Sequence, residues 1–242
     1  TQVARVYQMH QSLTDGMFPV RWVSDLGYGY GYPIFSFYAP LAYYIGALFM
    51  GFGFSAIVAT KMMIGLGLVL AGVTMYFLAR EFWGEKGGLV SGVLYALAPY
   101  HGTNVYVRGA IAEMWAYAFI PLAFWGIWHF SKTYKWTSFV LGSIGVAGII
   151  LSHNLTAMMV VPFLFLSSFI LAFLRRKNGK RALAPFFIIG FGFLLASFYL
   201  IPTLSEIRYT NVSSQTGGGA DYKYHFVCFQ QFWVSQIGYG GS

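Results

Sequence analysis

Charged side chains are scarce in this sequence, since only 9% of its 242 residues are Asp, Glu, Lys or Arg. A soluble domain usually carries about 25%, so this chain cannot cover its surface with polar groups in water. The single cysteine, Cys228, excludes a disulfide within the chain. The sequence also lacks metal-binding spacings of the CxxC or HExxH type, a Walker loop and a nucleophile elbow. These absences leave a soluble enzyme without support.

Hydrophobic residues are abundant instead, at 57% of the chain, and aromatic residues make up 20%. The 29 glycines suit helices that pack closely in a membrane, and the tyrosines and tryptophans suit the headgroup region. We therefore predict an all-α, polytopic transmembrane bundle with about six spans. The chain has no initiator Met, and we expect both of its ends to be cut within loops.

The apolar runs give the expected organisation of this single transmembrane domain. A hydrocarbon core of about 30 Å requires about 20 helical residues, so the runs Leu89–Phe130 and Trp136–Leu174 must each fold back once. Leu183–Pro202 crosses once. We expect residues 1–54 to form an extracytoplasmic loop with interfacial helices, 55–202 to form six transmembrane helices, and 203–242 to begin a second extracytoplasmic loop.

Residues 33–79 leave two arrangements open. Two crossings would place residues 1–33 in the cytoplasm, whereas one crossing, at about 56–79, would leave them outside. Pro33, Pro40 and the glycines of 46–53 weaken a straight span through 34–53, and the aromatic residues there suit an interface. These features favour one crossing.

Three short basic loops decide the orientation: Arg80–Lys86, Lys132–Lys135 and Arg175–Arg181. They lie on one side of the membrane and hold nine Lys and Arg residues against two Glu. The positive-inside rule makes that side cytoplasmic. This placement also explains the net charge of +8 without nucleic acid, because the cations do not line one polar face.

Polar residues at the opposite hairpin tips are the candidate site residues. Arg108 and Glu113 stand between two spans, where ionisable groups must be paired or face water. Five helical residues separate their side chains by about 140°, so only a turn between them would let both point into one cavity. His153 and Asn154 occupy the next tip. The alternatives are that Arg108 and Glu113 reach lipid headgroups and that His153 only satisfies the turn.

Glycine and tyrosine alternate from Gly27 to Pro33. This pattern is not a dinucleotide fingerprint, because the strand–helix context and the final glycine spacing are missing. Alternating flexible backbone and flat rings, Tyr30 and Tyr32 among them, can contact a ligand such as a sugar. The same pattern also fits a packed loop anchored by its aromatic residues.

With these residues in view, the sequence resembles the C-superfamily of polytopic membrane glycosyltransferases, and within it the bacterial membrane proteins described as related to 6-pyruvoyl-tetrahydropterin synthase. Protein O-mannosyltransferase-like and aminoarabinose-transferase-like proteins belong with them. The resemblance covers most of the chain and rests on residues 1–49, LAREFWG at 78–84, YVRGAIAE at 106–113, SHNLTA at 152–157 and YHFVCFQQFWVSQIGYGGS at 224–242. Cys228 and Gln236 depart from the closing motif.

The resemblance implies a glycosyltransferase that moves a sugar from a polyprenyl-phosphate donor to a glycan, lipid or protein acceptor of the cell envelope. It places the active face on the outside of a bacterial or archaeal cytoplasmic membrane. The family's principal catalytic Asp would precede Thr1, so this chain alone is expected to be inactive. A divalent cation stays open, since some relatives use one and others do not.

The resemblance also assigns candidate roles. Glu113 and His153 are the catalytic candidates, and the substrate-binding candidates are Arg5, Arg21, Tyr30, Tyr32, Arg108 and Asn154. Two other functions stay open: a transporter or flippase for lipid-linked glycans, and a non-catalytic membrane scaffold. Substitution of Glu113 and Arg108 would discriminate between them, because a transporter would lose lipid-glycan movement rather than transfer.

Overall fold

The computed structural model describes residues 2–210, and their regular secondary structure is helical apart from one isolated antiparallel bridge between Val23 and Tyr32. The chain divides into two compact units, Thr1–Thr203 and Leu204–Ser242. The helices described below belong to the first unit, except that the last turn of α9 and a short 3₁₀ turn, η3 (Ile207–Tyr209), belong to the second. The closing motif at 224–242, with Cys228 and Gln236, lies outside the described residues.

The helices follow the order expected from the apolar runs. Three short ones come first, namely α1 (Gln2–Thr14), α2 (Ile34–Phe37) and α3 (Leu41–Gly51). The longer ones are α4 (Ala56–Ala96), α6 (Ile111–Thr133), α7 (Trp136–Ser152), α8 (Asn154–Leu174) and α9 (Ala184–Glu206). Between them lie α5 (Pro99–Gly102), the π-helix η1 (Thr103–Arg108) and the 3₁₀ helix η2 (Arg176–Leu183).

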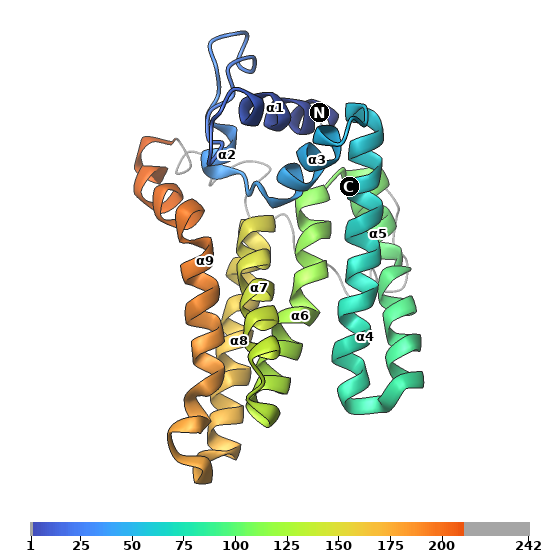
Figure 1. Ribbon diagram of the computed structural model, residues 1–242, viewed down its shortest axis with the longest axis vertical. Coiled ribbons are helices and arrows are strands. Elements are labelled where there is room, and N and C mark those ends of the chain that lie inside the picture. The colour runs from blue at the N-terminus through green and yellow to red at the C-terminus, as the bar shows by residue number, and fades with distance from the viewer. Residues whose placement is uncertain (1, 211–242) are drawn as a thin grey trace, which may run out of the picture. The chain divides into compact units, whose positions relative to one another are not determined.

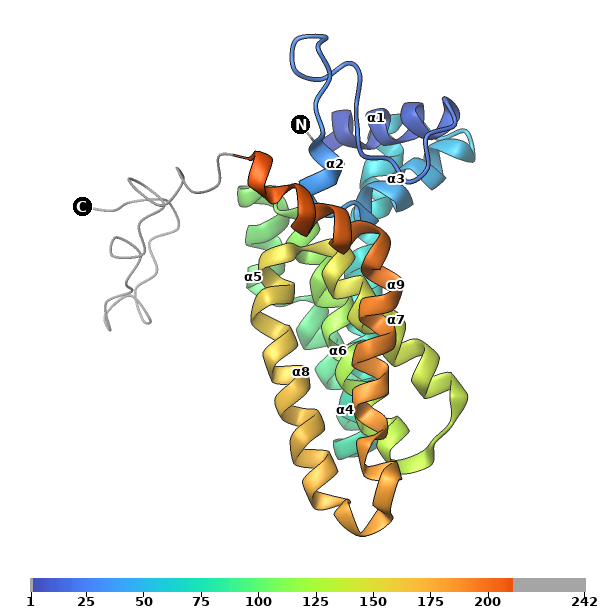
Figure 2. The same cartoon turned by 90° about the vertical axis from the view of Figure 1, so that its left-hand side faces the viewer.

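Within residues 2–210, four helical segments are long and apolar enough to cross a membrane: 56–108, 111–133, 154–174 and 184–209. The predicted all-α membrane bundle is thus confirmed, and the count differs from about six for two reasons. The first segment reverses direction at Gly84, and α7 has 17 residues, which is slightly short for a span. Helices α6 to α9 therefore follow the predicted hairpins, and α7 is the shortest of the four (Figures 1 and 2).

Gly84 makes the reversal in α4 possible. Its φ of 69° lies in the left-handed region that side chains with a Cβ rarely adopt. The two arms of α4 then run back along each other so closely that a Cβ on Gly92 would come 2.7 Å from the carbonyl oxygen of Gly72. The arms form a helical hairpin, visible in Figure 1.

The helices α6 and α7 pack through glycine. A Cβ on Gly126 would overlap the Cα of Gly142, and a Cβ on Gly145 would lie 2.9 Å from the Cα of Ala123. In hydrocarbon, where burial of apolar side chains gives no driving force between helices, such close backbone contact holds helices together by van der Waals packing. This pair forms the centre of the bundle.

The short helices α1 and α3 cover one end of the bundle, which we call the loop end (Figure 1). Val6 and Met9 of α1, Tyr43 of α3, Met63 of α4 and Trp115 of α6 form one buried cluster there. The helix α3 has 11 residues, or about 16 Å, which is too short to cross a membrane. Its position along the outer membrane surface stays a prediction.

The three basic loops meet at the opposite end, which we call the basic end. Glu81 Oε1 of α4 lies 2.6 Å from Nδ1 of His129 in α6, and Arg175 after α8 donates to the carbonyl of Ser131 in α6. Figures 1 and 2 show the turn within α4, the turn between α6 and α7 and the turn between α8 and α9 at the same end of the helices. The basic end therefore gathers the three loops that were predicted to share one side of the membrane, and the cytoplasmic location of that side stays a prediction.

Candidate functional site

The candidate site lies at the loop end, where the chain leaves the α4 hairpin and enters α6. The π-helix η1 ends at Gly109, whose φ of 61° is left-handed, and α6 begins two residues later. A π-helical turn is rare and is often found at functional sites, because it widens the helix and redirects its side chains. The amide of Gln2 in α1 donates to the carbonyl of Gly109 at 2.6 Å, which ties this turn to one of the helices that cover the loop end.

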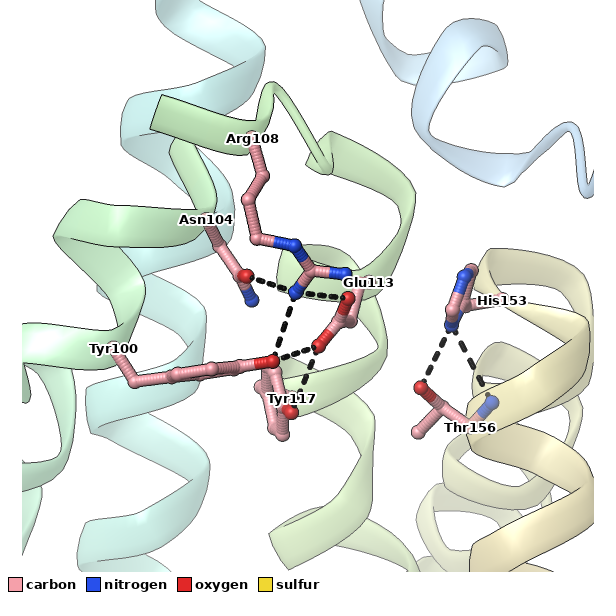
Figure 3. Close-up of polar contacts among 7 residues, drawn as sticks. All are labelled: Tyr100, Asn104, Arg108, Glu113, Tyr117, His153 and Thr156. Atoms are coloured by element: carbon pink, nitrogen blue, oxygen red, sulfur yellow. Dashed lines mark hydrogen bonds and ion pairs between the residues drawn. The ribbon is translucent and has the colours of Figure 1, made fainter. Parts of the chain in front are cut away.

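The turn brings Arg108 and Glu113 into direct contact. Arg108 Nη1 lies 3.0 Å from Glu113 Oε2, so the two charges pair across the turn at Gly109 rather than along one helix face (Figure 3). Both residues come from the predicted hairpin tip. A turn between them was the arrangement expected to let both side chains point into one cavity.

Two tyrosines and an asparagine complete this cluster. The hydroxyl of Tyr100 donates to Glu113 Oε1 at 2.7 Å, and that of Tyr117 donates to the same oxygen at 3.2 Å. Arg108 Nη1 also donates to Asn104 Oδ1 at 2.7 Å and to the hydroxyl of Tyr100 at 2.9 Å. Both oxygens of the Glu113 carboxylate are therefore engaged, which holds it as an anion in a buried position.

The exposure of the pair is unequal. The Glu113 side chain is 10% exposed, whereas the Arg108 side chain is 37% exposed. The bonds of Arg108 within the cluster all use Nη1, so Nη2 and Nε take no part in it. A guanidinium anchored by one nitrogen, with the rest of its fork accessible, can bind an anionic oxygen from outside the cluster.

His153 lies between α7 and α8, beside the cluster (Figure 3). Its Nδ1 accepts from the backbone N–H of Thr156 at 3.4 Å and lies 2.8 Å from the Thr156 hydroxyl, so it caps α8. Burial lowers the pKa of His153 below its ordinary value, with the negative charge of Glu113 raising it and the positive charge of Arg108 lowering it. His153 is thus neutral at pH 7, with its hydrogen on Nε2.

Four of the predicted substrate-binding residues have partners or surroundings other than the side chains of this cluster. The Arg5 guanidinium sits 4.4 Å above the ring of Tyr38 and donates to the hydroxyl of Tyr43 at 3.3 Å, which ties α1 to the segment of α2 and α3. Arg21 reaches the carbonyl of Phe198 in α9 at 3.4 Å. Tyr30 and Tyr32 are exposed on the loop before α2.

Asn154 has a structural contact at the same tip as His153. Its side-chain amide donates to the carbonyl of Phe37 at 2.9 Å and its oxygen accepts from the Tyr199 hydroxyl at 3.0 Å. These bonds join α8 to α9 and to α2. Among the predicted residues, Arg108, Glu113 and His153 are therefore the ones that share one region.

Sequence reasoning missed Tyr100, Asn104 and Tyr117. Asn104 precedes Arg108 by four residues and Tyr117 follows Glu113 by four, which is the spacing of neighbours on a helix face and was a usable signal. Tyr100 reaches Glu113 across η1, and no sequence spacing indicates that contact.

The described residues do not provide a ligand set for a metal ion. They contain no group of three His, Cys, Asp or Glu side chains, and the carboxylate oxygens of Glu113 are already taken by Tyr100, Tyr117 and Arg108.

Comparisons with known proteins identify relatives of this chain. A family model described as a 6-pyruvoyl-tetrahydropterin synthase related domain, membrane protein, matches residues 35–216. An uncharacterized protein of Lactococcus lactis subsp. cremoris (strain MG1363) is 26% identical over 217 residues, which cover 85% of this chain and 35% of that relative. The chain thus spans about a third of that relative's length. No solved structure matches. The family match includes Arg108, Glu113 and His153 and begins after Arg5, Arg21, Tyr30 and Tyr32.

Proposed function

The chain belongs to the 6-pyruvoyl-tetrahydropterin synthase related family of membrane proteins, and from that premise we propose that it forms part of a glycosyltransferase. The proposed enzyme moves a sugar from a polyprenyl-phosphate donor to an envelope acceptor on the extracytoplasmic side. The observation that carries the proposal is the anchored Arg108 guanidinium, held by Glu113, Asn104 and Tyr100 beside His153. The resemblance to C-superfamily glycosyltransferases supplies the reaction class.

The reaction requires charge stabilisation at the leaving group. An acceptor hydroxyl attacks the anomeric carbon, the bond from that carbon to the phosphate oxygen breaks, and the electron pair leaves on the polyprenyl phosphate. A carboxylate base takes the hydroxyl proton, and the resemblance places that principal base before Thr1. Arg108 would bind the phosphate through Nη2 and Nε, the nitrogens that the cluster leaves unused.

Glu113 has a supporting part in this scheme. Its carboxylate already accepts from Tyr100, Tyr117 and Arg108, so it has little capacity to take a proton from an acceptor. We assign it as a positioning residue that fixes the direction of the Arg108 fork. His153, neutral and with Nδ1 occupied by Thr156, offers its Nε2–H to a phosphate or acceptor oxygen.

The location of the cluster suits a lipid-borne donor. It lies at the loop end, opposite the three basic loops, and the positive-inside rule places that end outside the cytoplasm. A polyprenyl chain in the outer leaflet would then present its phosphate at the depth where spans end. The short helices α1 and α3 cover this region and would separate the reacting atoms from water.

Variants of the full-length protein test the proposal in isolated membranes supplied with a panel of radiolabelled polyprenyl-phosphate sugars. Arg108→Gln should lower transfer to the endogenous acceptor about 100-fold, the usual effect of removing one charge-stabilising donor. Arg108→Lys should recover only part of it, because an ammonium lacks the fork. The matched control is Arg80→Gln, which removes an exposed cation paired with Glu85 at the basic end.

Membrane abundance, measured by immunoblot, must be equal in all variants. Equal transfer by the Arg108→Gln and Arg80→Gln proteins would overturn the assignment of Arg108. If the variants transfer sugar normally in detergent solution but cells lose lipid-linked glycan from the outer leaflet, the protein is a transporter. If neither activity depends on Arg108, it is a scaffold.

A further inference from the structure

A second region of interest is a cavity of about 380 Å³ near the basic end, far along the bundle from the Arg108 cluster. We call it the basic-end cavity. Three helices form its walls: Phe82 and Trp83 come from α4, Trp128 comes from α6, and Leu171 and Leu174 come from α8. Its volume lies within the range of sites that hold small molecules or lipid chains.

The chemistry of the walls selects an apolar occupant. The lining side chains are hydrocarbon, aromatic or thioether groups, and their polar atoms are the Ser167 hydroxyl and the indole nitrogens of Trp83 and Trp128. The Ser167 hydroxyl donates to the carbonyl of Leu164 at 2.8 Å, so it offers no free donor to a ligand. A polar molecule entering this space could replace few of its hydrogen bonds to water, with the two indole N–H groups as donors, whereas an acyl chain has none to lose.

Cations lie at the rim of the same cavity. Lys132 Nζ sits 4.7 Å from the centre of the Trp128 ring, one of the walls, and 3.4 Å from Glu81. Arg175 directly follows the wall residue Leu174, and its guanidinium donates to the carbonyl of Ser131 in α6. Arg176 is the next cation along the chain, stacked 4.6 Å from the Phe173 ring. Glu81 Oε1 also lies 2.6 Å from Nδ1 of His129.

Two other apolar grooves on the bundle differ in construction. One lies between the two arms of α4, and the other is lined by α7, α9 and Leu183. Neither has walls from three of the long helices. The basic-end cavity combines three walls with a cationic rim, which is the pattern expected for a lipid with a negative head group.

We infer that the basic-end cavity binds one acyl chain of an anionic phospholipid such as phosphatidylglycerol, with the phosphate held by Lys132 and Arg175. The lipid comes from the leaflet that faces the basic end. By joining α4, α6 and α8, it stabilises the end of the bundle opposite the candidate site. This inference does not rest on the proposed transferase activity.

Native mass spectrometry of the full-length purified protein tests the inference, with phosphatidylglycerol and phosphatidylcholine added in equal amounts. The wild type should retain phosphatidylglycerol in preference. Each cation near a membrane surface contributes roughly a fivefold preference, so Lys132→Gln should lower the ratio of the two adducts by about that factor. Lys132→Gln/Arg175→Gln should remove the preference.

A pair of cavity variants locates the lipid. Ser167→Trp fills the basic-end cavity and should abolish the retained phosphatidylglycerol. Gly190→Trp, in the groove lined by α7 and α9, is the matched control, since a Cβ there meets nothing within 4 Å and binding should be unchanged. Equal adducts for both lipids on the wild type, or equal loss in both Trp variants, would overturn the inference. Displacement of phosphatidylglycerol by equimolar polyprenyl phosphate would reassign the cavity to the donor's lipid carrier.

Discussion

The two ends of the bundle each hold a glutamate bonded to a cation, but the partners come from different distances along the chain. At the loop end, Glu113 pairs with Arg108 and with Tyr100 and Tyr117, all within 13 residues of it. At the basic end, Glu81 pairs with His129 and Lys132, which lie 48 and 51 residues away on another helix. The first network shapes one turn, whereas the second joins two helices.

This difference predicts that removing each network has a different effect on the protein. Loss of a local network should change the geometry of the turn and the groups that it presents, while the bundle stays intact. Loss of an inter-helix network should weaken the bundle and leave the chemistry of the loop end unchanged. The two networks act separately when the helices between them are rigid. The first prediction therefore changes the packing of those helices.

Gly126→Ala should have the largest effect on stability. The added Cβ would overlap the Cα of Gly142 and come 2.8 Å from its backbone N, so α6 and α7 must separate. Overpacking of this kind typically costs about 1–3 kcal/mol, and the rigid backbone on both sides puts this site near the upper figure. Thermal unfolding in detergent measures it. Gly190→Ala is the control, because nothing lies within 4 Å of its Cβ. Equal melting temperatures for the two variants would contradict the glycine packing.

Glu81→Gln should have the next largest effect. It removes the charge that binds His129 at 2.6 Å and Lys132 at 3.4 Å, and hydrogen bonds to charged groups contribute about 1.5–3 kcal/mol when shielded. Because the site is partly exposed, we expect a loss of about 1–2 kcal/mol. Glu85→Gln removes the same charge from a carboxylate that is 76% exposed, so its loss should stay below about 1 kcal/mol.

Activity measurements on the Glu81→Gln and Glu113→Gln proteins sharpen the comparison. Glu81→Gln should transfer sugar like the wild type at a temperature where both are folded, whereas Glu113→Gln should lose transfer even at a temperature where it is folded. A reversal of that pattern would show that the basic end, not the loop end, serves the reaction.

His153 provides a test based on pH. Burial lowers its pKa in the folded protein, so the unfolded state binds the proton more readily. The stability that the neutral form contributes is therefore complete above the unfolded pKa of about 6.5 and is lost as the pH falls through the folded value. His153→Asn keeps an acceptor for the Thr156 N–H but does not titrate, so its stability should fall less than that of the wild type below pH ~6.5.

The same titration connects His153 to the cluster. The negative charge of Glu113 raises the pKa of His153. The loss of stability on protonation of His153 should therefore extend to lower pH in the Glu113→Gln protein than in the wild type. Melting temperatures across this pH range, measured in the wild type and in the Glu113→Gln protein, would show the shift. An unchanged transition would mean that His153 and Glu113 do not share one electrostatic environment.

Most of the fold could be predicted from the sequence, because it depends on the lengths of the apolar runs and on the positions of the charged residues between them. Apolar length and the position of basic loops predicted the order of the hairpins and the gathering of Arg80–Lys86, Lys132–Lys135 and Arg175–Arg181 at one end. The span count was harder to predict. The reversal at Gly84 and the 17-residue length of α7 depend on one backbone conformation and on a few residues at a helix end.

The site was only partly accessible for the same reason. Ionisable residues between apolar runs pointed to Arg108, Glu113 and His153, since their presence there is costly. The π-helical turn and the left-handed Gly109 that bring Tyr100 onto Glu113 leave no periodic trace. Arg5 was a candidate because a guanidinium can bind phosphate with two nitrogens; the structure stacks it over Tyr38, a contact that its charge and position in the sequence do not indicate, and its role in substrate binding stays a prediction.

Tyr30→Ala should have the smallest effect, and it tests whether the exposed loop belongs functionally to the loop end. The Tyr30 side chain is 89% exposed, so its removal should change the free energy of unfolding by less than about 0.5 kcal/mol. If its ring stacks on an acceptor, the KM for that acceptor should rise roughly threefold with kcat unchanged, because the contact is the same in the ground and transition states. Steady-state kinetics at varied acceptor concentration measure both constants. A fall in kcat would instead place Tyr30 beside the reacting atoms, and unchanged constants would restrict substrate binding to the cluster of Arg108.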